Sequence, residues 1–348
     1  MSGRYIRSLS LAILVTAAAA SGIASAQQGL VAPRPLTSPQ PPQPTNAAGT
    51  PVEGWVTVRY SVGADGKPSG VHAVDVMPPT IDPAPTVAAV SGWTFSPGLQ
   101  NGRPIDWHNS ETVVTFRLQS GPEASSPEFS DRYGAIAEML AADPIDFAAA
   151  NAASQALIGA HSTRLADLGL ALTQAAVIHY EAKDPHSALA AMRRATDPRV
   201  PMLGGTELFP AVQLRLQLEN DLGRIDDALE TYGRLAKGLG PRASDAVFAQ
   251  LGAELRMKSS DDEFLAISGR LDGGSWRIDA DRRYFFLSDV ENGSVNTIVA
   301  ECDTRRIELP FDPDDNYGLP DGFGNCTLFV EGAPGTTFYF VAVLPPEE

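Results

Sequence analysis

The histidines are the first residues to consider, because clustered histidines would indicate a metal site or a general base. They are separated along the chain, and no two of them have the spacing of a metal-binding pair: His72, His108, His161, His179 and His186. The sequence also contains no HExxH, GxSxG, phosphate-binding loop or dinucleotide fingerprint. We therefore predict no catalytic residues, no metal and no cofactor, with an enzyme of an unrecognised type as an alternative.

One acidic stretch, Asp312 to Gly318, partly matches a calcium-binding loop. Asp312, Asp314 and Asn316 occupy the first, third and fifth positions. The sixth position, which needs glycine, is Tyr317, and the twelfth, which needs a bidentate glutamate, is Phe323. The stretch is therefore predicted to be a solvated acidic turn.

The two cysteines, Cys302 and Cys326, both lie in the last part of the chain. In an exported protein a single pair most simply forms one disulfide. Such a loop of about 25 residues would gain roughly 3 kcal/mol of stability. Two free buried thiols are the alternative.

The first 26 residues have the pattern of an export signal. Arg4 and Arg7 precede a short apolar run, and Ala24-Ser25-Ala26 is a small-x-small cleavage pattern. We expect cleavage after Ala26 and a periplasmic protein without further membrane association. An uncleaved anchor is the alternative.

The charge of the chain is acidic and unevenly distributed. The formal net charge is −16, and residues 271–348 alone contribute −10, from 5 arginines and 15 acidic residues. Phosphate groups would be repelled by such a surface, so nucleic acid is not an expected partner.

Residues 27–51 are rich in proline and are predicted to be an extended linker. From Gly54 the pattern alternates, with Val56 and Val58 on one face and Thr57 and Arg59 on the other, which predicts a half-buried strand. A turn at Asp65-Gly66, a second strand, a short helix and a third strand at residues 111–118 follow.

This order of elements, with its turn and aromatic residues, resembles the TonB C-terminal domain family. The matching positions are Gly54, Asp65, Gly66, Trp93, Phe95, Pro97, Gly102 and Pro104. On this resemblance Trp93 and Phe95 fill the space between helix and sheet, and Pro97 ends their segment. The resemblance implies a bacterial envelope protein that contacts a protein partner.

Residues 125–270 are rich in alanine and leucine and resemble tetratricopeptide repeats. One unit carries Leu172, Ala176, Tyr180, Ala188, Met192 and Ala195, and a second carries Gly223, Ala228, Tyr232 and Leu235. Such units stack and leave a groove for a peptide or a protein. A helical bundle without repeats is the alternative.

Residues 271–348 contain six short segments of strand-forming residues separated by turn residues, which predict a small all-β sandwich. The predicted fold is therefore multidomain: a signal at 1–26, a linker at 27–51, an α+β domain at 52–119, an all-α domain at 125–270 and an all-β domain at 271–348. The last has no recognised family.

These features together predict a non-enzymatic adaptor that binds a protein or peptide in the bacterial envelope. The third strand of the first domain is expected at a sheet edge, where Val113, Thr115 and Arg117 would lie beside an added strand. The helical domain or a second copy could instead cover this edge. The alternative function is energy transduction for outer-membrane transport, which requires the uncleaved anchor.

Overall fold

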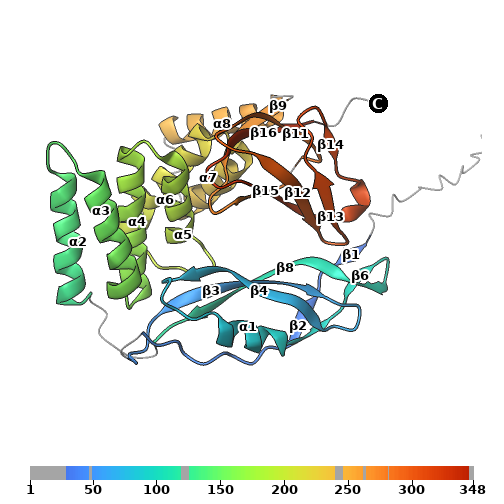
Figure 1. Cartoon of the computed structure of the whole chain (residues 1–348), viewed down its shortest axis with the longest axis horizontal. Helices are drawn as coiled ribbons and strands as arrows, with labels where there is room; N and C mark the ends of the chain where they lie inside the picture. The colour runs from blue at the N-terminus through green and yellow to red at the C-terminus, as the bar shows by residue number, and fades with distance from the viewer. Residues whose placement is uncertain are drawn as a thin grey trace, which may run out of the picture.

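The computed structural model describes residues 29–46, 49–118, 125–239, 246–261, 264–280 and 282–344. The predicted signal segment and its cleavage site lie outside these residues. The predicted fold class is confirmed: an α+β module, a helical region and an all-β region with two sheets follow one another along the chain (Figure 1).

The first module is a three-stranded antiparallel sheet with one helix on it. The strands β3 (Gly54–Val62), β4 (Pro68–Met77) and β8 (Trp107–Phe116) have the order β4-β3-β8. The helix α1 (Ala84–Ser91) packs against β3 and β4. Val56 and Val58 are fully buried in the core of this module, as the alternation predicts.

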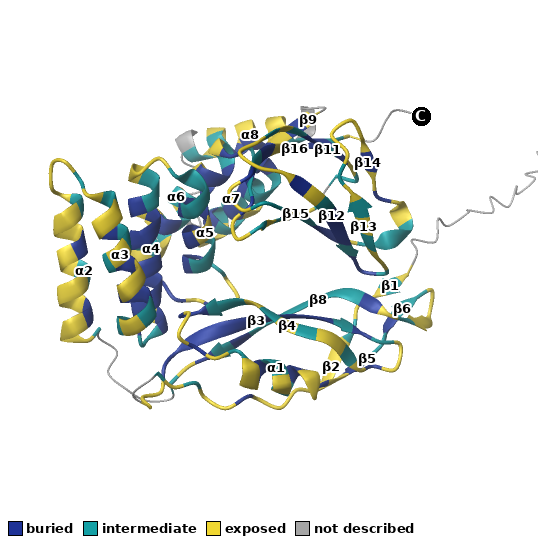
Figure 2. Ribbon diagram, viewed as in Figure 1, coloured by how far each residue is buried: buried dark blue, intermediate teal, exposed yellow. Residues whose placement is uncertain are grey.

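The strand β3 is buried on both faces rather than on one (Figure 2). Thr57 and Arg59 are only 5% and 8% exposed. The prediction of a half-buried strand is therefore wrong, because the face away from α1 is covered by the rest of the chain.

The aromatic segment after α1 contributes to the core of the module. Trp93 and Phe95 are buried in the core of the module, and the Phe95 ring is 5.3 Å from that of Tyr60. The strand β5 (Thr94–Ser96) ends before Pro97, and a hairpin of β6 (Gly98–Gln100) and β7 (Arg103–Ile105) follows. Its turn needs positive φ angles, 52° at Asn101 and 76° at Gly102.

The proline-rich segment is not a free spacer where the structure describes it. β1 (Leu30–Val31) pairs with β6, and β2 (Arg34–Thr37) pairs with β5. The indole N–H of Trp93 donates to the carbonyl oxygen of Pro39 at 3.1 Å. A proline lacks an N–H group but keeps its carbonyl, so such a segment can still line a sheet edge.

The helical region is a stack in which helices adjacent in sequence pack together (Figure 1). Its α-helices are α2 (Pro127–Leu140), α3 (Phe147–Ala156), α4 (Leu165–Glu181), α5 (Pro185–Ala195), α6 (Gly205–Asp221), α7 (Ile225–Leu239) and α8 (Ala246–Asp261). Acceptor side chains cap several of them, and Asp184 Oδ1 accepts from the N–H of Ser187 at the start of α5.

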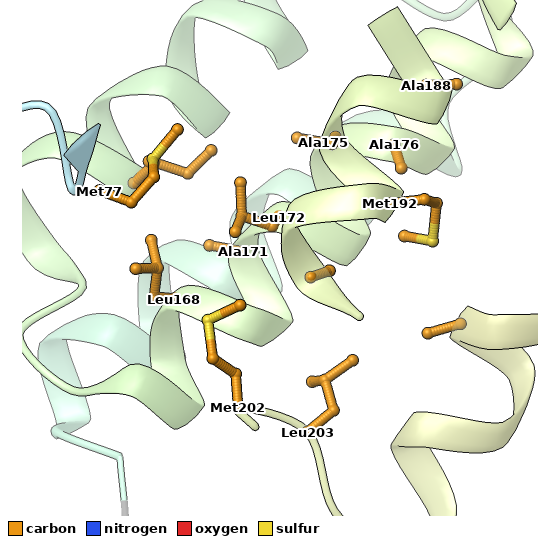
Figure 3. Packing of buried hydrophobic residues seen from close by; sticks show 14 of the residues in the cluster. Met77, Leu168, Ala171, Leu172, Ala175, Ala176, Ala188, Met192, Met202 and Leu203 are labelled. Atoms are coloured by element: carbon orange, nitrogen blue, oxygen red, sulfur yellow. The ribbon is translucent and has the colours of Figure 1, made fainter. Parts of the chain in front are cut away.

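Most packing positions of the predicted repeats are buried between helices, whereas Tyr180, Gly223 and Tyr232 are only partly buried. Figure 3 shows Leu172, Ala176, Ala188 and Met192 in the contact between α4 and α5, and each is at most 2% exposed. The region is thus a stack of helical hairpins, and no repeat family has been identified for it.

The last region contains two four-stranded antiparallel sheets. One has the order β10-β15-β12-β13, from β10 (Ser275–Asp279), β15 (Cys326–Gly332), β12 (Val295–Cys302) and β13 (Arg306–Pro310). The other has the order β14-β11-β16-β9, from β14 (Tyr317–Gly318), β11 (Tyr284–Glu291), β16 (Thr337–Val343) and β9 (Phe264–Arg270). All six predicted strands are present, whereas β9 and β14 were missed.

The boundaries between modules differ from the sequence-based ones. The strand β9 pairs with β16, so the β region begins before residue 271. Buried residues of α7 and α8 share one core with both C-terminal sheets, those of α2 to α5 form another, and those of α6 are divided between the two. The helical region is therefore divided between two cores.

A disulfide joins Cys302 and Cys326, as predicted. The two residues are directly opposite each other on the neighbouring strands β12 and β15. The bond therefore links two strands of one sheet.

Candidate functional site

A cleft of about 830 Å³ lies where the three regions meet. Two polar sheet faces form its opposite walls. The first belongs to β3, β4 and β8, on the side away from α1. The second belongs to β10, β12, β13 and β15, and the C-terminal end of α5 with the segment after it closes the space between them. Figure 1 shows these two sheets on opposite sides of the centre of the molecule.

Strand alternation explains why this cleft is polar. On β12, Ile298 and Ala300 point into the core, whereas Val299 and Glu301 line the cleft. Both sheets thus turn their apolar faces to their own cores and their polar faces to each other.

Six arginines line the cleft, and they come from five different elements or segments. They are Arg59 of β3, Arg193 and Arg194 of α5, Arg199 after α5, Arg277 of β10 and Arg306 of β13. The acidic lining residues are Asp75, Glu111, Asp197, Glu301 and Glu331. Sequence reasoning missed this cluster, because its members are spread over almost 250 positions and share no motif.

Glu111 is the residue that connects all three regions. Its carboxylate accepts hydrogen bonds from Arg59 Nη2 at 3.2 Å, Arg199 Nη1 at 2.8 Å and Arg277 Nη1 at 2.9 Å. Burial alone would raise the pKa of Glu111, but the charge of Arg277, the hydrogen bond from Arg199 and the charge of Arg59 outweigh it. The net effect holds the pKa of Glu111 below its ordinary value, so the group is ionised at neutral pH.

Arg59 is the most deeply placed cation of the cleft. Its guanidinium carbon lies 4.5 Å from the centre of the Phe329 ring on the opposite wall, in a cation–π contact. Burial, followed by the charge of Arg277, lowers the pKa of Arg59, whereas Glu111 and Glu301 raise it. An arginine stays protonated despite such a shift, so Arg59 is a fixed positive charge.

A second junction joins β4 to α5. Asp75 Oδ1 accepts from Arg194 Nη2 at 2.8 Å, and Asp75 Oδ2 accepts from the indole N–H of Trp55 at 2.9 Å. Arg193 and Arg194 lie in the last turn of α5, where a positive charge is favoured by the helix dipole.

The strand β8 is at an edge of its sheet, where Val113, Thr115 and Arg117 were expected to lie. Val113 packs against the helical core, and Arg117 Nη2 donates to the carbonyl of Pro201 at 2.9 Å. At the other end of the strand, the N–H of His108 donates to the carbonyl of Asp303 at 3.0 Å. Both neighbouring regions therefore contact this strand.

Of the histidines, His72 and His108 line the cleft, whereas the other three lie in the helical region. Among the described residues, no group of three or more His, Cys, Asp and Glu side chains could hold a metal ion. In the acidic turn, Asp312 Oδ1 accepts from the N–H of Asp314 at 3.0 Å. The charged and hydrogen-bonding groups that line the cleft can recognise a ligand.

The first module matches a known family. Residues 39–118 match the family "Gram-negative bacterial TonB protein C-terminal". The match covers about a quarter of the chain and begins inside the proline-rich segment, which agrees with the packing of that segment on the module. No curated protein matches the chain.

A TonB C-terminal domain implies interaction with outer-membrane transporters, and domains of this family are generally non-enzymatic. In the part of the chain that the structure describes, no helix is both long and apolar enough to cross a membrane. The family match and the disulfide are consistent with the cell envelope.

Proposed function

We propose that this protein is a non-enzymatic adaptor of the bacterial envelope, exported to the periplasm, that binds an extended protein segment along β8. The observation that carries the proposal is the position of β8 at the edge of the sheet in the module that matches the TonB C-terminal family. An edge strand offers backbone N–H and C=O groups to an added strand.

The direction of the backbone groups supports this role. The N–H of Leu118, just after β8, donates to Glu53 Oε1 on the β3 side of the strand at 2.8 Å. N–H groups alternate in direction along an extended strand. Those of Thr115 and Val113, three and five residues earlier, therefore face away from β3.

A proline at either position tests the proposal, because proline removes the backbone donor. We expect Thr115→Pro and Val113→Pro to abolish capture of the partner from envelope fractions, while circular dichroism shows a folded protein. Val71→Pro is the matched control, since Val71 lies at a bulge of the opposite edge strand β4 and does not line the cleft. A photo-crosslinker at Thr115 should join the partner, and one at Val71 should not.

If both proline variants stay folded and retain the partner, the edge of β8 is not the interaction surface. The helical module would then be covering this edge through its contacts with Val113 and Arg117.

A further inference from the structure

The cleft between the two polar sheet faces presents arginines to an incoming ligand more than it presents acids. Four cleft arginines are about half exposed: Arg194 at 41%, Arg199 at 53%, Arg277 at 43% and Arg306 at 49%. The cleft-lining carboxylates that pair with them are 16–24% exposed: Asp75, Glu111, Asp197 and Glu301. Asp279 and Glu308 also pair with Arg277 and Arg306, are 69% and 61% exposed and do not line the cleft. These four acids of the cleft therefore form a lower layer, above which the guanidinium groups are exposed.

Several donors of these arginines remain available. A guanidinium group has five N–H donors in a planar fork that matches a carboxylate. Arg194 uses Nε and Nη2 on Asp75, and its Nη1 makes no hydrogen bond within the described part of the chain. Arg306 similarly uses Nη1 on Glu308, and its Nη2 makes no hydrogen bond to any described residue.

This surface contrasts with the rest of the molecule. The chain has a net charge of −16, yet six of its 26 basic residues line this one cleft, and all six are arginines. The excess of positive charge is small, because five acidic residues also line the cleft and Glu331 is exposed among them. Such a mixed surface favours a ligand with separated carboxylates over a dense polyanion, which the acids would repel.

The size and the apolar groups of the cleft favour a peptide. A volume of about 830 Å³ is large for a ligand site, for which roughly 300–1,000 Å³ is typical. Val74, which is 39% exposed, and the partly buried Phe329 add apolar surface to the walls. Together they provide contacts for apolar side chains between the carboxylates of an extended chain.

We propose that this cleft is a binding site for an acidic peptide segment in which carboxylate and apolar side chains alternate. The carboxylates bind to Arg194 on α5, which closes the cleft, and to Arg306 on the wall formed by the C-terminal sheet. The apolar side chains contact Val74 and Phe329. His108 and Glu111 of β8 line this site, but Val113 and Thr115 do not, so the site does not depend on strand addition at those two positions.

The probe is a fluorescein-labelled hexapeptide of alternating glutamate and valine, measured by fluorescence anisotropy with the full chain. We expect binding that weakens with added salt and that is lost when glutamine replaces glutamate in the peptide. Arg194→Gln and Arg306→Gln should each weaken binding about tenfold, because each removes a charged hydrogen bond. Arg132→Gln is the control, since Arg132 is 50% exposed and paired with a glutamate on α2, away from the cleft.

Three results would overturn the proposal. One is equal binding of the glutamate and glutamine peptides. Another is binding by both Arg194→Gln and Arg306→Gln as tight as by Arg132→Gln. The third is loss of binding in Thr115→Pro with both cleft variants unaffected, because the peptide would then bind along β8. Binding of the peptide that is retained in Thr115→Pro supports the cleft as the binding site. Tighter binding of polyphosphate than of the peptide would show that the cleft takes a different class of ligand and would also overturn the proposal.

Discussion

Replacing Glu111 with glutamine should destabilise the packing of the three regions against one another. The side chain of Glu111 is 16% exposed and that of its partner Arg59 is 9% exposed. Removing one member of a buried ion pair costs about 3–5 kcal/mol, because the remaining charge stays desolvated. Arg199 and Arg277 are about half exposed, so water can solvate them after the loss, and glutamine keeps one acceptor oxygen. We therefore expect a loss of about 2–3 kcal/mol in the free energy of unfolding.

The pH dependence of the stability difference between the wild type and Glu111→Gln gives a sharper test. The folded pKa of Glu111 lies below its ordinary value of 4.5. The stability contributed by its ionised form is therefore fully present above pH 4.5 and is lost as the pH falls through the folded pKa. The gap between the wild type and Glu111→Gln should be largest at neutral pH and should shrink as the pH falls below 4.5.

Urea unfolding, followed by tryptophan fluorescence, measures these free energies. The matched control is Glu308→Gln, because Glu308 pairs with a cleft arginine but is 61% exposed. A pair of this kind contributes about 0–1 kcal/mol. The reasoning is refuted if the two variants lose equal stability at neutral pH, or if the gap for Glu111→Gln stays constant in acid.

Three further predictions concern other parts of the chain. Non-reducing peptide mapping of the native protein should recover Cys302 and Cys326 in one linked fragment, and labelling of both by a thiol reagent before reduction would contradict this. Cys302→Ala should lower the free energy of unfolding by about 2–5 kcal/mol. Gly54→Ala should lower the free energy of unfolding by about 1–3 kcal/mol, because the added Cβ would lie 2.1 Å from a backbone oxygen of β4. Gly134→Ala on α2 should raise it by about 0.5–1 kcal/mol, since nothing lies within 4 Å of the added Cβ. Thermal unfolding temperatures that shift in the same direction for both variants would count against this packing. Intact mass of the native protein should begin at Gln27, and a mass that retains residues 1–26 in a membrane pellet would instead support an energy transducer.

Local pattern was sufficient to predict most elements of this fold. The alternation of Val56 and Val58 and the turn at Asp65-Gly66 identified β3 and the hairpin to β4, because side-chain period and turn chemistry act over a few residues. The same reasoning identified six strands of the last region and the burial of the hairpin contacts between α4 and α5. It missed β14, which is only two residues long, and β9, which lies before the predicted start of the β region.

Only the tertiary structure shows that the polar faces of the two sheets face each other across a cleft. Alternation shows that Thr57 and Arg59 share a face of β3, but it does not show that this face is buried against two other regions. The same holds for the proline-rich segment, whose place along β5 and β6 depends on edges formed by distant residues. In the sequence, the six cleft arginines look like ordinary surface charges. They line one cleft because the tertiary packing brings two sheets and a helix end together, and no local sequence pattern records that packing.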